Sequence, residues 1–287
     1  MPHDPPRLLC GLIGSGIQRS LTPAMQRAEA QAQGLALHYQ LIDLDRRGLG
    51  ADALPGLLDA LRTIGFDGFN VTYPCKQAVM PLLDDLSDAA RRMGAVNTVV
   101  QRDGRLVGHN TDGSGWRWGF ERQLPDADLS RVVLLGAGGA GSAIAHALLD
   151  MGVASLALVD AEAARAQALA ASLNAAHGGT RARAEATVAA ALAGATGLVH
   201  ATPTGMDKLP GLPLDAALLR PGLWVSEIVY FPLDTALLQA ARGRGCRVAD
   251  GGGMAVGQAV GAFGLFTGRR ADAARMDAHF RRLVAAA

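Results

Sequence analysis

A glycine-rich turn near the middle of this sequence has the spacing of a phosphate-binding loop. Gly136, Gly138 and Gly141 follow the apolar run 132–135 at GxGxxG spacing, and a helical pattern of apolar residues comes after them. The first glycine permits a tight turn, the second lets the backbone approach a pyrophosphate, and the third lets helix and strand pack closely. A second predicted strand ends at Asp160, whose carboxylate can accept hydrogen bonds from the hydroxyls of an adenine ribose. Together these residues predict a dinucleotide site.

Four clusters of polar side chains in the first third of the chain have the residue types needed to bind and turn over a hydroxylated small molecule. The clusters are Ser20 with Thr22, residues 70–76, residues 95–98 and residues 109–112. Each lies next to the end of a predicted strand. Open α/β sheets bind ligands beyond the carboxyl ends of their strands, so we expect the four clusters to converge on one ligand.

Each cluster also has a purely structural explanation. Ser20 and Thr22 can cap a helix, with Thr22 as the N-cap and Pro23 at the first helical position. Lys76 on its own is typical of a solvated surface lysine. Asn97 is harder to explain in this way, because it lies in an otherwise apolar strand and a buried amide needs hydrogen-bond partners.

Other polar residues of the chain are equally compatible with structural roles. Asn70 and Thr72 can form a turn after a strand, and Asp112, which precedes a glycine, can be a turn acid. His109 and His200 are expected to be structural rather than catalytic. Local sequence therefore leaves both readings open for these positions.

The elements that must position the polar clusters alternate between strand and helix. The expected strands are residues 8–13, 37–44, 68–71, 97–101 and 105–109, and the expected helices begin near Pro23 and Pro74 and cover 54–64 and 88–93. Asp103-Gly104 between the last two strands is a strong hairpin signal. This alternation predicts an α/β substrate-binding catalytic domain over residues 1–113.

A Rossmann domain with a doubly wound parallel sheet is expected over residues 114–250, after a linking helix at 114–123. Its predicted strands are residues 132–135, 155–159, 180–184, 198–201, 223–228 and 246–249, and its clearest later helix is 161–173. Two final helices, 254–266 and 271–285, are expected to return to the first domain. Residues 251–268 carry no charge, but seven of them are glycine, so a buried helix is expected there rather than a membrane span.

Composition restricts the class of protein. The 287 residues are enough for two domains, and a net charge of +1 with 18% charged residues indicates neither nucleic acid nor a membrane surface as a partner. Three scattered cysteines argue against a disulfide framework or a zinc site, and no metal is expected. The first residues lack an apolar signal core, so a cytoplasmic location is expected.

Taken together, these motifs resemble the shikimate dehydrogenase family over nearly the whole chain. The motifs of that family stand here as Ser20-Leu21-Thr22-Pro23, residues 70–76, residues 94–98, Asn110-Thr111-Asp112, residues 136–141, Ala201-Thr202-Pro203 before Gly205-Met206, Tyr230 with Pro232, and Asp250-Gly251 leading to Gln258 and Thr267-Gly268. So many motifs in the same order make the resemblance specific.

The resemblance implies an alcohol dehydrogenase that acts on a cyclic polyhydroxy carboxylic acid, in aromatic amino acid biosynthesis through chorismate or in quinate metabolism. Lys76 and Asp112 would be the catalytic pair, with Lys76 handling the proton of the reacting hydroxyl. The residues that would bind the substrate are Ser20 and Thr22 at the carboxylate, and Thr72, Asn97, Asp112, Gln258 and the nearby Tyr230 at the ring. A lysine away from water can titrate near neutral pH, whereas a neighbouring aspartate raises its pKa, so the two effects compete.

The resemblance also assigns the cofactor site. The residues that would contact NAD are Gly136, Ala137, Gly138, Gly139, Ala140, Asp160, Arg165, Thr202, Pro203, Ile228 and Gly251. Family members that use NADP generally have Asn-Arg-Thr or Asn-Arg-Ser where this chain has Asp160-Ala161-Glu162. A carboxylate there repels a 2′-phosphate, so NAD is favoured, and Arg165 would lie along the adenine.

Departures from the family pattern narrow the expectation further. Thr22 in place of a serine and Gln77 after Lys76, together with Asp160, resemble the branch that oxidises both quinate and shikimate with NAD. His200 stands where asparagine is usual and Glu227 where aspartate is usual, which leaves the hydrogen bonding around these positions open.

Three other functions are alternatives to this one. A non-catalytic regulatory protein that binds quinate or shikimate would be free to lose Lys76, Asp112 and the glycine loop, which are all present. A folate- or glutamyl-linked NADP enzyme disagrees with Asp160, and an aminoshikimate dehydrogenase stays open. The expected partner is a small-molecule substrate, shikimate or quinate, and the chain is expected to be a monomer or a homodimer. The direction of the reaction and the preference among these acids stay open.

Overall fold

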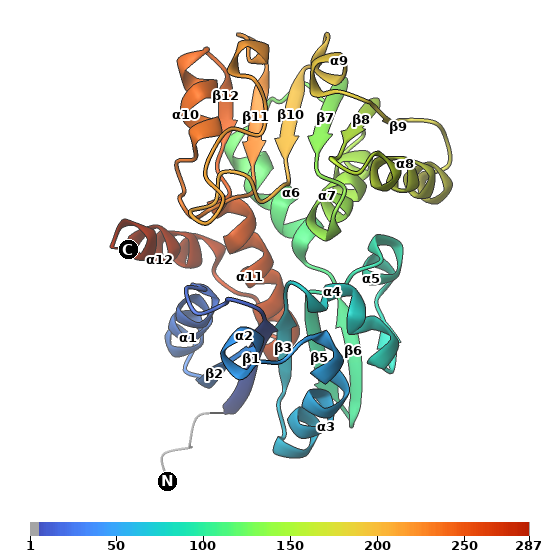
Figure 1. The fold of residues 1–287 in the computed structure, drawn as a ribbon. Coiled ribbons are helices and arrows are strands. Elements are labelled where there is room, and N and C mark those ends of the chain that lie inside the picture. Colours follow the sequence, from blue (N-terminus) through green and yellow to red (C-terminus); the bar gives the residue numbers. More distant parts are fainter. Residues whose placement is uncertain (1–5, 287) are drawn as a thin grey trace. The chain divides into compact units, whose positions relative to one another are not determined.

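The computed structural model describes residues 6–286, which fold into two α/β units (Figure 1). The first unit comprises the described residues up to Thr111 and from Gln258 onward, and the second runs from Asp112 to Gly257. The sequence places these boundaries after residues 113 and 250. In the structure they lie after Thr111 and Gly257. The helix that begins at Asp112 belongs to the second unit, and the first turns of the helix that begins at Gly252 pack against it.

The first unit contains a six-stranded mixed sheet. Its strands, in spatial order, are β2 (Ala36–Asp43), β1 (Arg7–Gly14), β3 (Gly68–Val71), β5 (Thr98–Arg102), β6 (Arg105–His109) and β4 (Asp85–Leu86). The pairs β2–β1, β1–β3 and β6–β4 are parallel, and β3–β5 and β5–β6 are antiparallel. The predicted hairpin is confirmed: Asp103 and Gly104 have φ values of 51° and 77°, as a two-residue turn between twisted strands requires.

Helices cover both faces of this sheet. They are α1 (Thr22–Ala32), α2 (Leu44–Arg47), α3 (Leu54–Ile64), α4 (Cys75–Ala78), α5 (Asp88–Met93), the later part of α11 (Gly252–Thr267) and α12 (Ala273–Ala285). Side chains alternate along β1, so that Cys10 and Leu12 pack with Phe266 of α11, whereas Ile13 packs with Leu58 of α3. The C-terminal helices thus return to the first unit, as predicted.

The second unit contains a six-stranded sheet in which all strands are parallel. The order is β12 (Arg247–Ala249), β11 (Trp224–Glu227), β10 (Gly197–His200), β7 (Arg131–Leu135), β8 (Ser155–Val159) and β9 (Ala182–Ala184). The chain starts in the middle at β7, moves outward to β9, and then crosses to β10 on the other side. This order is that of the Rossmann fold, with its switch point between β7 and β10.

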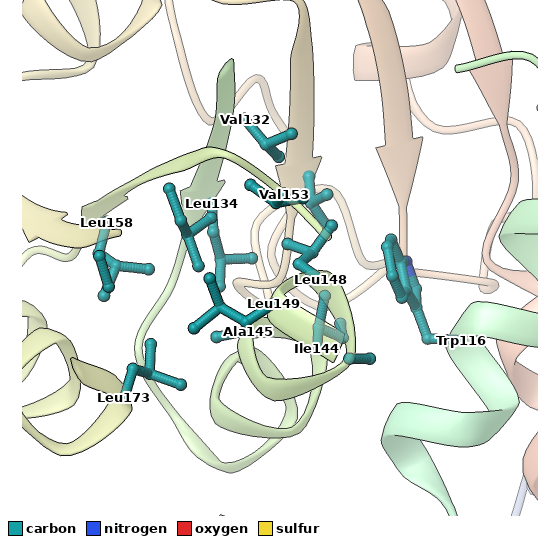
Figure 2. Close-up of a cluster of buried hydrophobic side chains, with 14 of the residues drawn as sticks. Trp116, Val132, Leu134, Ile144, Ala145, Leu148, Leu149, Val153, Leu158 and Leu173 are labelled. Carbon is teal, nitrogen blue, oxygen red and sulfur yellow. The ribbon is translucent and has the colours of Figure 1, made fainter. Parts of the chain in front are cut away.

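Helices also cover both faces of the second sheet. They are α6 (Asp112–Gln123), α7 (Gly139–Asp150), α8 (Ala163–His177), α9 (Val188–Leu192), α10 (Ala236–Gly243) and the start of α11. Figure 2 shows the cluster on one face, where Ile144 and Leu148 of α7 pack with Val132 and Leu134 of β7, and Trp116 of α6 belongs to the same cluster. The opposite face buries Val133 and its neighbours against α9 and α10.

Glycines let α6 and α11 approach each other within the second unit. A Cβ added to Gly257 would lie 2.4 Å from the carbonyl oxygen of Gly115, and one added to Gly119 would lie 2.5 Å from the carbonyl carbon of Gly253. The uncharged glycine-rich stretch is therefore a buried helix with a close neighbour, as expected. Among residues 6–286, no helix is both long and apolar enough to cross a membrane.

Within the first unit, an ion pair with a buried carboxylate ties the C-terminal helix α12 to α1. The carboxylate of Glu29 on α1 accepts hydrogen bonds from Nη2 and Nε of Arg275 on α12, at 2.7 and 2.8 Å, from the backbone N–H of Asp272 and from Gln33. Burial would raise the pKa of Glu29, but these hydrogen bonds together hold it below its ordinary value. Glu29 is 1% exposed, so losing its charge would leave the donors around it unsatisfied.

We predict that Glu29→Gln lowers the free energy of unfolding at pH 7 by about 2 kcal/mol. Because the folded-state pKa of Glu29 is depressed, its contribution is present above the unfolded pKa of about 4.3 and is lost as the pH falls through the folded value. Urea denaturation of wild type and variant at pH 7 and at low pH measures both effects.

The matched control is Asp277→Asn, which removes an ion pair with Arg281 within α12 whose carboxylate, unlike that of Glu29, is partly exposed. We expect it to change the stability by less than about 0.5 kcal/mol. An equal loss in the two variants would contradict the assignment of Glu29 as the tie between α1 and α12.

Candidate active site

The glycine turn of the second unit has the geometry of a pyrophosphate site. Gly136 has a φ of 101°, which is open to glycine at little cost, and a Cβ added to Gly141 would lie 2.0 Å from the carbonyl oxygen of Gly136. By contrast, a Cβ added to Gly138 meets nothing within 4 Å. Gly138 is the residue before α7, so the open space lies at the N-terminus of a helix, where backbone N–H groups bind phosphate.

Asp160 lies beside this turn at the end of β8. Its carboxylate accepts hydrogen bonds from the backbone N–H of Ala137 at 2.7 Å and of Glu162 at 2.9 Å. It remains partly exposed, so its other lone pairs can accept the hydroxyls of a ribose. Arg165, expected along the adenine, forms an exposed ion pair with Glu162 at 2.8 Å.

The residues assigned to the nicotinamide end of the cofactor lie in the same unit, where one segment borders Gly136 and another borders Gly251. A Cβ added to Gly136 would lie 2.7 Å from the carbonyl oxygen of Ala201, beside Thr202 and Pro203. A Cβ added to Gly251 would lie 2.5 Å from the carbonyl oxygen of Ile228. The open glycine turn, the helix N-terminus and the ribose acid fit a dinucleotide. Within residues 6–286 no cluster of His, Cys, Asp and Glu is arranged to hold a metal ion.

In the first unit, Asp43 at the end of β2 holds the turn that leads to Ser20. Its buried carboxylate accepts hydrogen bonds from the backbone N–H of Gly16 at 3.0 Å and from Nε2 of Gln18 at 2.8 Å. Burial would raise the pKa of Asp43, but hydrogen bonds from Gln18 and from neighbouring backbone amides hold it below its ordinary value. The carboxylate therefore fixes the backbone just before Ser20.

The predicted N-cap at Thr22 is wrong, because Thr22 is already the first residue of α1 and Leu21 stands before it. The helix start is instead supported by Ser20, whose Oγ accepts a hydrogen bond from the N–H of Thr22 at 3.3 Å. Both side chains are half-buried at the first turn of α1, where the backbone dipoles favour an anion.

A cavity of about 650 Å³ opens beside Ser20 in the first unit. It is also lined by Gln18, by the polar end of β2 and by Arg27, Arg46 and Arg47. The three arginines make this side of the unit electropositive, which suits a carboxylate ligand.

A continuous network of buried polar side chains crosses the first sheet. The hydroxyl of Tyr39 donates to Oδ1 of Asn70 at 2.7 Å, and Nδ2 of Asn70 donates to the hydroxyl of Thr98 at 2.9 Å. Oδ1 of Asn97 accepts from the hydroxyl of Thr98 and from the backbone N–H of Thr111, both at 2.9 Å, while its Nδ2 contacts Oγ1 of Thr111 at 3.0 Å. The buried amide of Asn97 therefore has the partners that its sequence context required.

Backbone hydrogen bonds bring Thr72 and Lys76 to the same end of the sheet. The N–H of Thr72 donates to the carbonyl of Ile13 at 2.9 Å, and the carbonyl of Lys76 accepts from the N–H of Val96 at 2.9 Å. Lys76, on the short helix α4, is thus attached next to Asn97.

Thr111 extends the network to the last segment of the first unit and to the start of the second. Its hydroxyl contacts the backbone carbonyl of Gln258 at 3.3 Å. Asp112 follows it directly and is the first residue of α6, with an exposed fraction of 1%. The Asn97 network therefore fixes the residue before Asp112.

Tyr230 follows β11 in the second unit, and its ring lies 4.9 Å from that of Phe231 between centroids. Burial raises the pKa of Tyr230, so that its hydroxyl stays protonated and able to donate at neutral pH.

Sequence reasoning missed Tyr39 and Asp43. Tyr39 is the only residue of the alternating strand β2 that combines a buried ring with a hydroxyl. Asp43 is an acid at the carboxyl end of a strand, where a solvated turn acid is the usual expectation. In both cases the local signal exists, but the side-chain partners, Asn70 for Tyr39 and Gln18 for Asp43, lie at least 25 residues away in sequence.

Comparison with known proteins gives consistent matches. The sequence profile described as the shikimate dehydrogenase substrate binding domain matches residues 12–99. A shikimate dehydrogenase (NADP(+)) of Streptomyces avermitilis is 57% identical over 97% of each chain, and a quinate/shikimate dehydrogenase (NAD(+)) of Corynebacterium efficiens is 50% identical over 98% of this chain and 99% of its own. The structure of quinate dehydrogenase from Corynebacterium glutamicum in complex with NAD matches with a TM-score of 0.90 and 46% identity, covering 96% of this chain and 99% of that one.

We predict that two glycine substitutions in the turn separate ligand binding from folding. Gly138→Ala should leave the thermal unfolding midpoint unchanged, because the added Cβ meets open space, but should weaken dinucleotide binding at least tenfold by blocking the approach of the phosphates. Gly141→Ala should lower the unfolding midpoint as well, because its Cβ would overlap the carbonyl of Gly136. Calorimetric titration and thermal unfolding measure the two effects. Unchanged dinucleotide binding in Gly138→Ala would show that the phosphates do not bind at this turn.

Proposed function

Because the chain belongs to the shikimate dehydrogenase family, we propose that it is an NAD-dependent enzyme that interconverts quinate and shikimate with their 3-dehydro acids. The single observation that carries the choice of NAD is Asp160. Its carboxylate is held beside the glycine turn by the backbone N–H of Ala137, where the adenine ribose of a dinucleotide would bind. A 2′-phosphate at that position would meet a negative charge.

A second candidate is an NADP-dependent shikimate dehydrogenase. The 57% identical relative is named as such, whereas the 50% identical relative and the matching NAD complex support the first candidate. Overall identity averages over the whole chain, but the charge beside the ribose is decided by a few residues. We therefore give Asp160 more weight than the difference between 57% and 50%.

The reaction removes a hydride and a proton from a secondary alcohol, and the bound dinucleotide would accept the hydride. Lys76 would take the proton of the reacting hydroxyl, and Asp112 would orient the ammonium group and bind a ring hydroxyl. Ser20 and Thr22 would bind the carboxylate at the start of α1, where the helix dipole favours an anion. Of the two, Ser20 also lines the cavity that contains three arginines. Thr72, Asn97 and Gln258 would bind the remaining hydroxyls, with Tyr230 as a further donor.

The lysine content of the chain supports the role of Lys76. Lysine and arginine together number 27, but only Lys76 and Lys208 are lysines. Arginine carries the positive charge at all the other basic positions apart from histidine, and a guanidinium does not give up its proton near neutral pH. Of the two lysines, Lys76 is the one attached next to Asn97, by the backbone bond to Val96, whereas Lys208 is exposed in the second unit.

The proposed function is tested by initial rates with quinate, shikimate and aminoshikimate, each with NAD and NADP. We expect both quinate and shikimate to be oxidised, with kcat/KM at least tenfold higher with NAD than with NADP, a difference of about 1.4 kcal/mol. Asp160→Ser should narrow this gap mainly by improving NADP. Asp160→Asn is the matched control for the charge, because it removes the negative charge but keeps a side-chain oxygen that can accept the hydrogen bond from the backbone N–H of Ala137.

Each departure from that result identifies another function. A wild-type preference for NADP would favour the second candidate, and the absence of quinate oxidation would leave an enzyme specific for shikimate. Binding of either acid without turnover under any condition would favour a regulatory protein.

We predict that Lys76→Ala lowers kcat by at least about a hundredfold, with a smaller effect on NAD affinity. Lys76→Arg keeps the charge but not the removable proton, and it should lose a comparable factor. Lys208→Ala is the control, because Lys208 is exposed in the second unit. Near-normal turnover in Lys76→Ala would show that a group other than Lys76 takes the proton of the reacting hydroxyl.

A further inference from the structure

A fully buried histidine and glutamate join the ends of two strands in the second unit. His200 and Glu227 are the last residues of β10 and β11, and they are paired in the parallel register. Nδ1 of His200 lies 2.9 and 3.0 Å from the two carboxylate oxygens of Glu227, and both side chains are inaccessible to solvent. This pair stands outside the catalytic residues described above.

The surroundings of Glu227 determine which partner donates. Its Oε1 accepts the backbone N–H groups of Ile228 at 2.8 Å and Val229 at 3.0 Å, and its Oε2 accepts the hydroxyl of Thr235 at 3.1 Å. Every neighbour of the carboxyl group is thus a donor, so Glu227 acts as an acceptor on both oxygens and Nδ1 of His200 donates. A buried carboxylate with this many donors is well compensated.

The other nitrogen of His200 reaches the cofactor segment. Nε2 lies within hydrogen-bond distance of Oγ1 of Thr202, which also accepts the N–H of Thr204 at 3.3 Å. The methyl group of Thr202 borders Gly136 of the glycine turn, because a Cβ added to Gly136 would lie 3.0 Å from it. On the other side, Glu227 fixes Ile228, whose carbonyl borders Gly251. The pair thus holds both strand ends to which the far end of the cofactor is assigned.

We propose that His200 is a positioning residue for the nicotinamide end of the cofactor, acting as a bridge from Glu227 to Thr202 without touching the cofactor itself. Nδ1 anchors the imidazole to the strand end of β11, and Nε2 sets the orientation of the Thr202 side chain. This inference rests on the proposed function in that it takes a nicotinamide dinucleotide to bind along the segments that carry Thr202 and Ile228.

The two nitrogens can be tested separately. The side-chain nitrogen of an asparagine occupies the position of histidine Nδ1, and that of a glutamine reaches the position of Nε2. His200→Asn therefore keeps the donor to Glu227 and deletes the contact with Thr202. His200→Gln keeps a partner for Thr202 and deletes the donor to Glu227.

We expect His200→Asn to raise the Kd for NAD about tenfold, measured by calorimetric titration of the full chain, with little loss in thermal unfolding midpoint. His200→Gln should lower the midpoint more and keep most of the NAD affinity. The KM for quinate or shikimate should stay within about twofold in both. If instead the variant with the larger loss of unfolding midpoint is also the one with the larger loss of NAD affinity, His200 is merely structural and the inference is overturned.

A double-mutant cycle tests whether His200 acts through Thr202. Thr202→Val should weaken NAD binding, and adding His200→Asn to it should cost little more, because the contact is already absent. Additive losses would overturn the inference. Ser226→Ala is the control, since Ser226 is equally buried one residue before Glu227 but bonds Nε1 of Trp116 at 3.1 Å; it should lower the midpoint without changing the Kd.

The titrations also separate this inference from the proposed function. Wild-type protein that binds neither NAD nor NADP would overturn both. If wild type and His200→Asn bind a dinucleotide with the same Kd, only the role of His200 is overturned.

Discussion

The requirement that buried polar groups be paired shapes both units of this protein at the carboxyl ends of their strands. In the first unit it produces the network from Tyr39 through Asn97 to Thr111, and in the second the His200–Glu227 pair. Each network crosses neighbouring strands, so it fixes strand ends relative to one another rather than one local turn. Asn97, which is proposed to bind the substrate, is in this way held by its polar neighbours Thr98 and Thr111.

The second constraint is the lack of a side chain at glycine, which lets two backbone segments approach each other closely. Gly141 allows α7 to begin against the turn that follows β7, and the glycines of α6 and α11 allow those helices to touch. A Cβ at Gly141, Gly257 or Gly119 would fall 2.0 to 2.5 Å from backbone atoms, which cannot move out of the way as a flexible side chain can. Gly138 differs, since its space is open and serves a ligand rather than the fold.

Cofactor choice illustrates how specificity within a family can depart from overall similarity. Nearly the whole chain aligns with relatives named for NADP and with relatives named for NAD, so the fold and the catalytic framework are compatible with both. In the function proposed above, the discrimination would depend on the charge of Asp160 beside the ribose, because a carboxylate and a phosphate repel each other over a short distance. The backbone N–H of Ala137, in the glycine turn, donates a hydrogen bond to the carboxylate of Asp160, so the acid is part of the turn itself.

Local patterns in the sequence determined most of the strands, helices and turns, whereas the tertiary structure decided which polar residues work together. The helix at 54–64, the strands at 68–71, 105–109 and 155–159, and the hairpin at Asp103-Gly104 all follow from interactions between residues close in sequence. The pairing of Glu29 with Arg275, 246 residues apart, and of Asp43 with Gln18 has no such local signature. Side-chain hydrogen bonds act over about 3 Å, so their partners are defined only once the chain has folded.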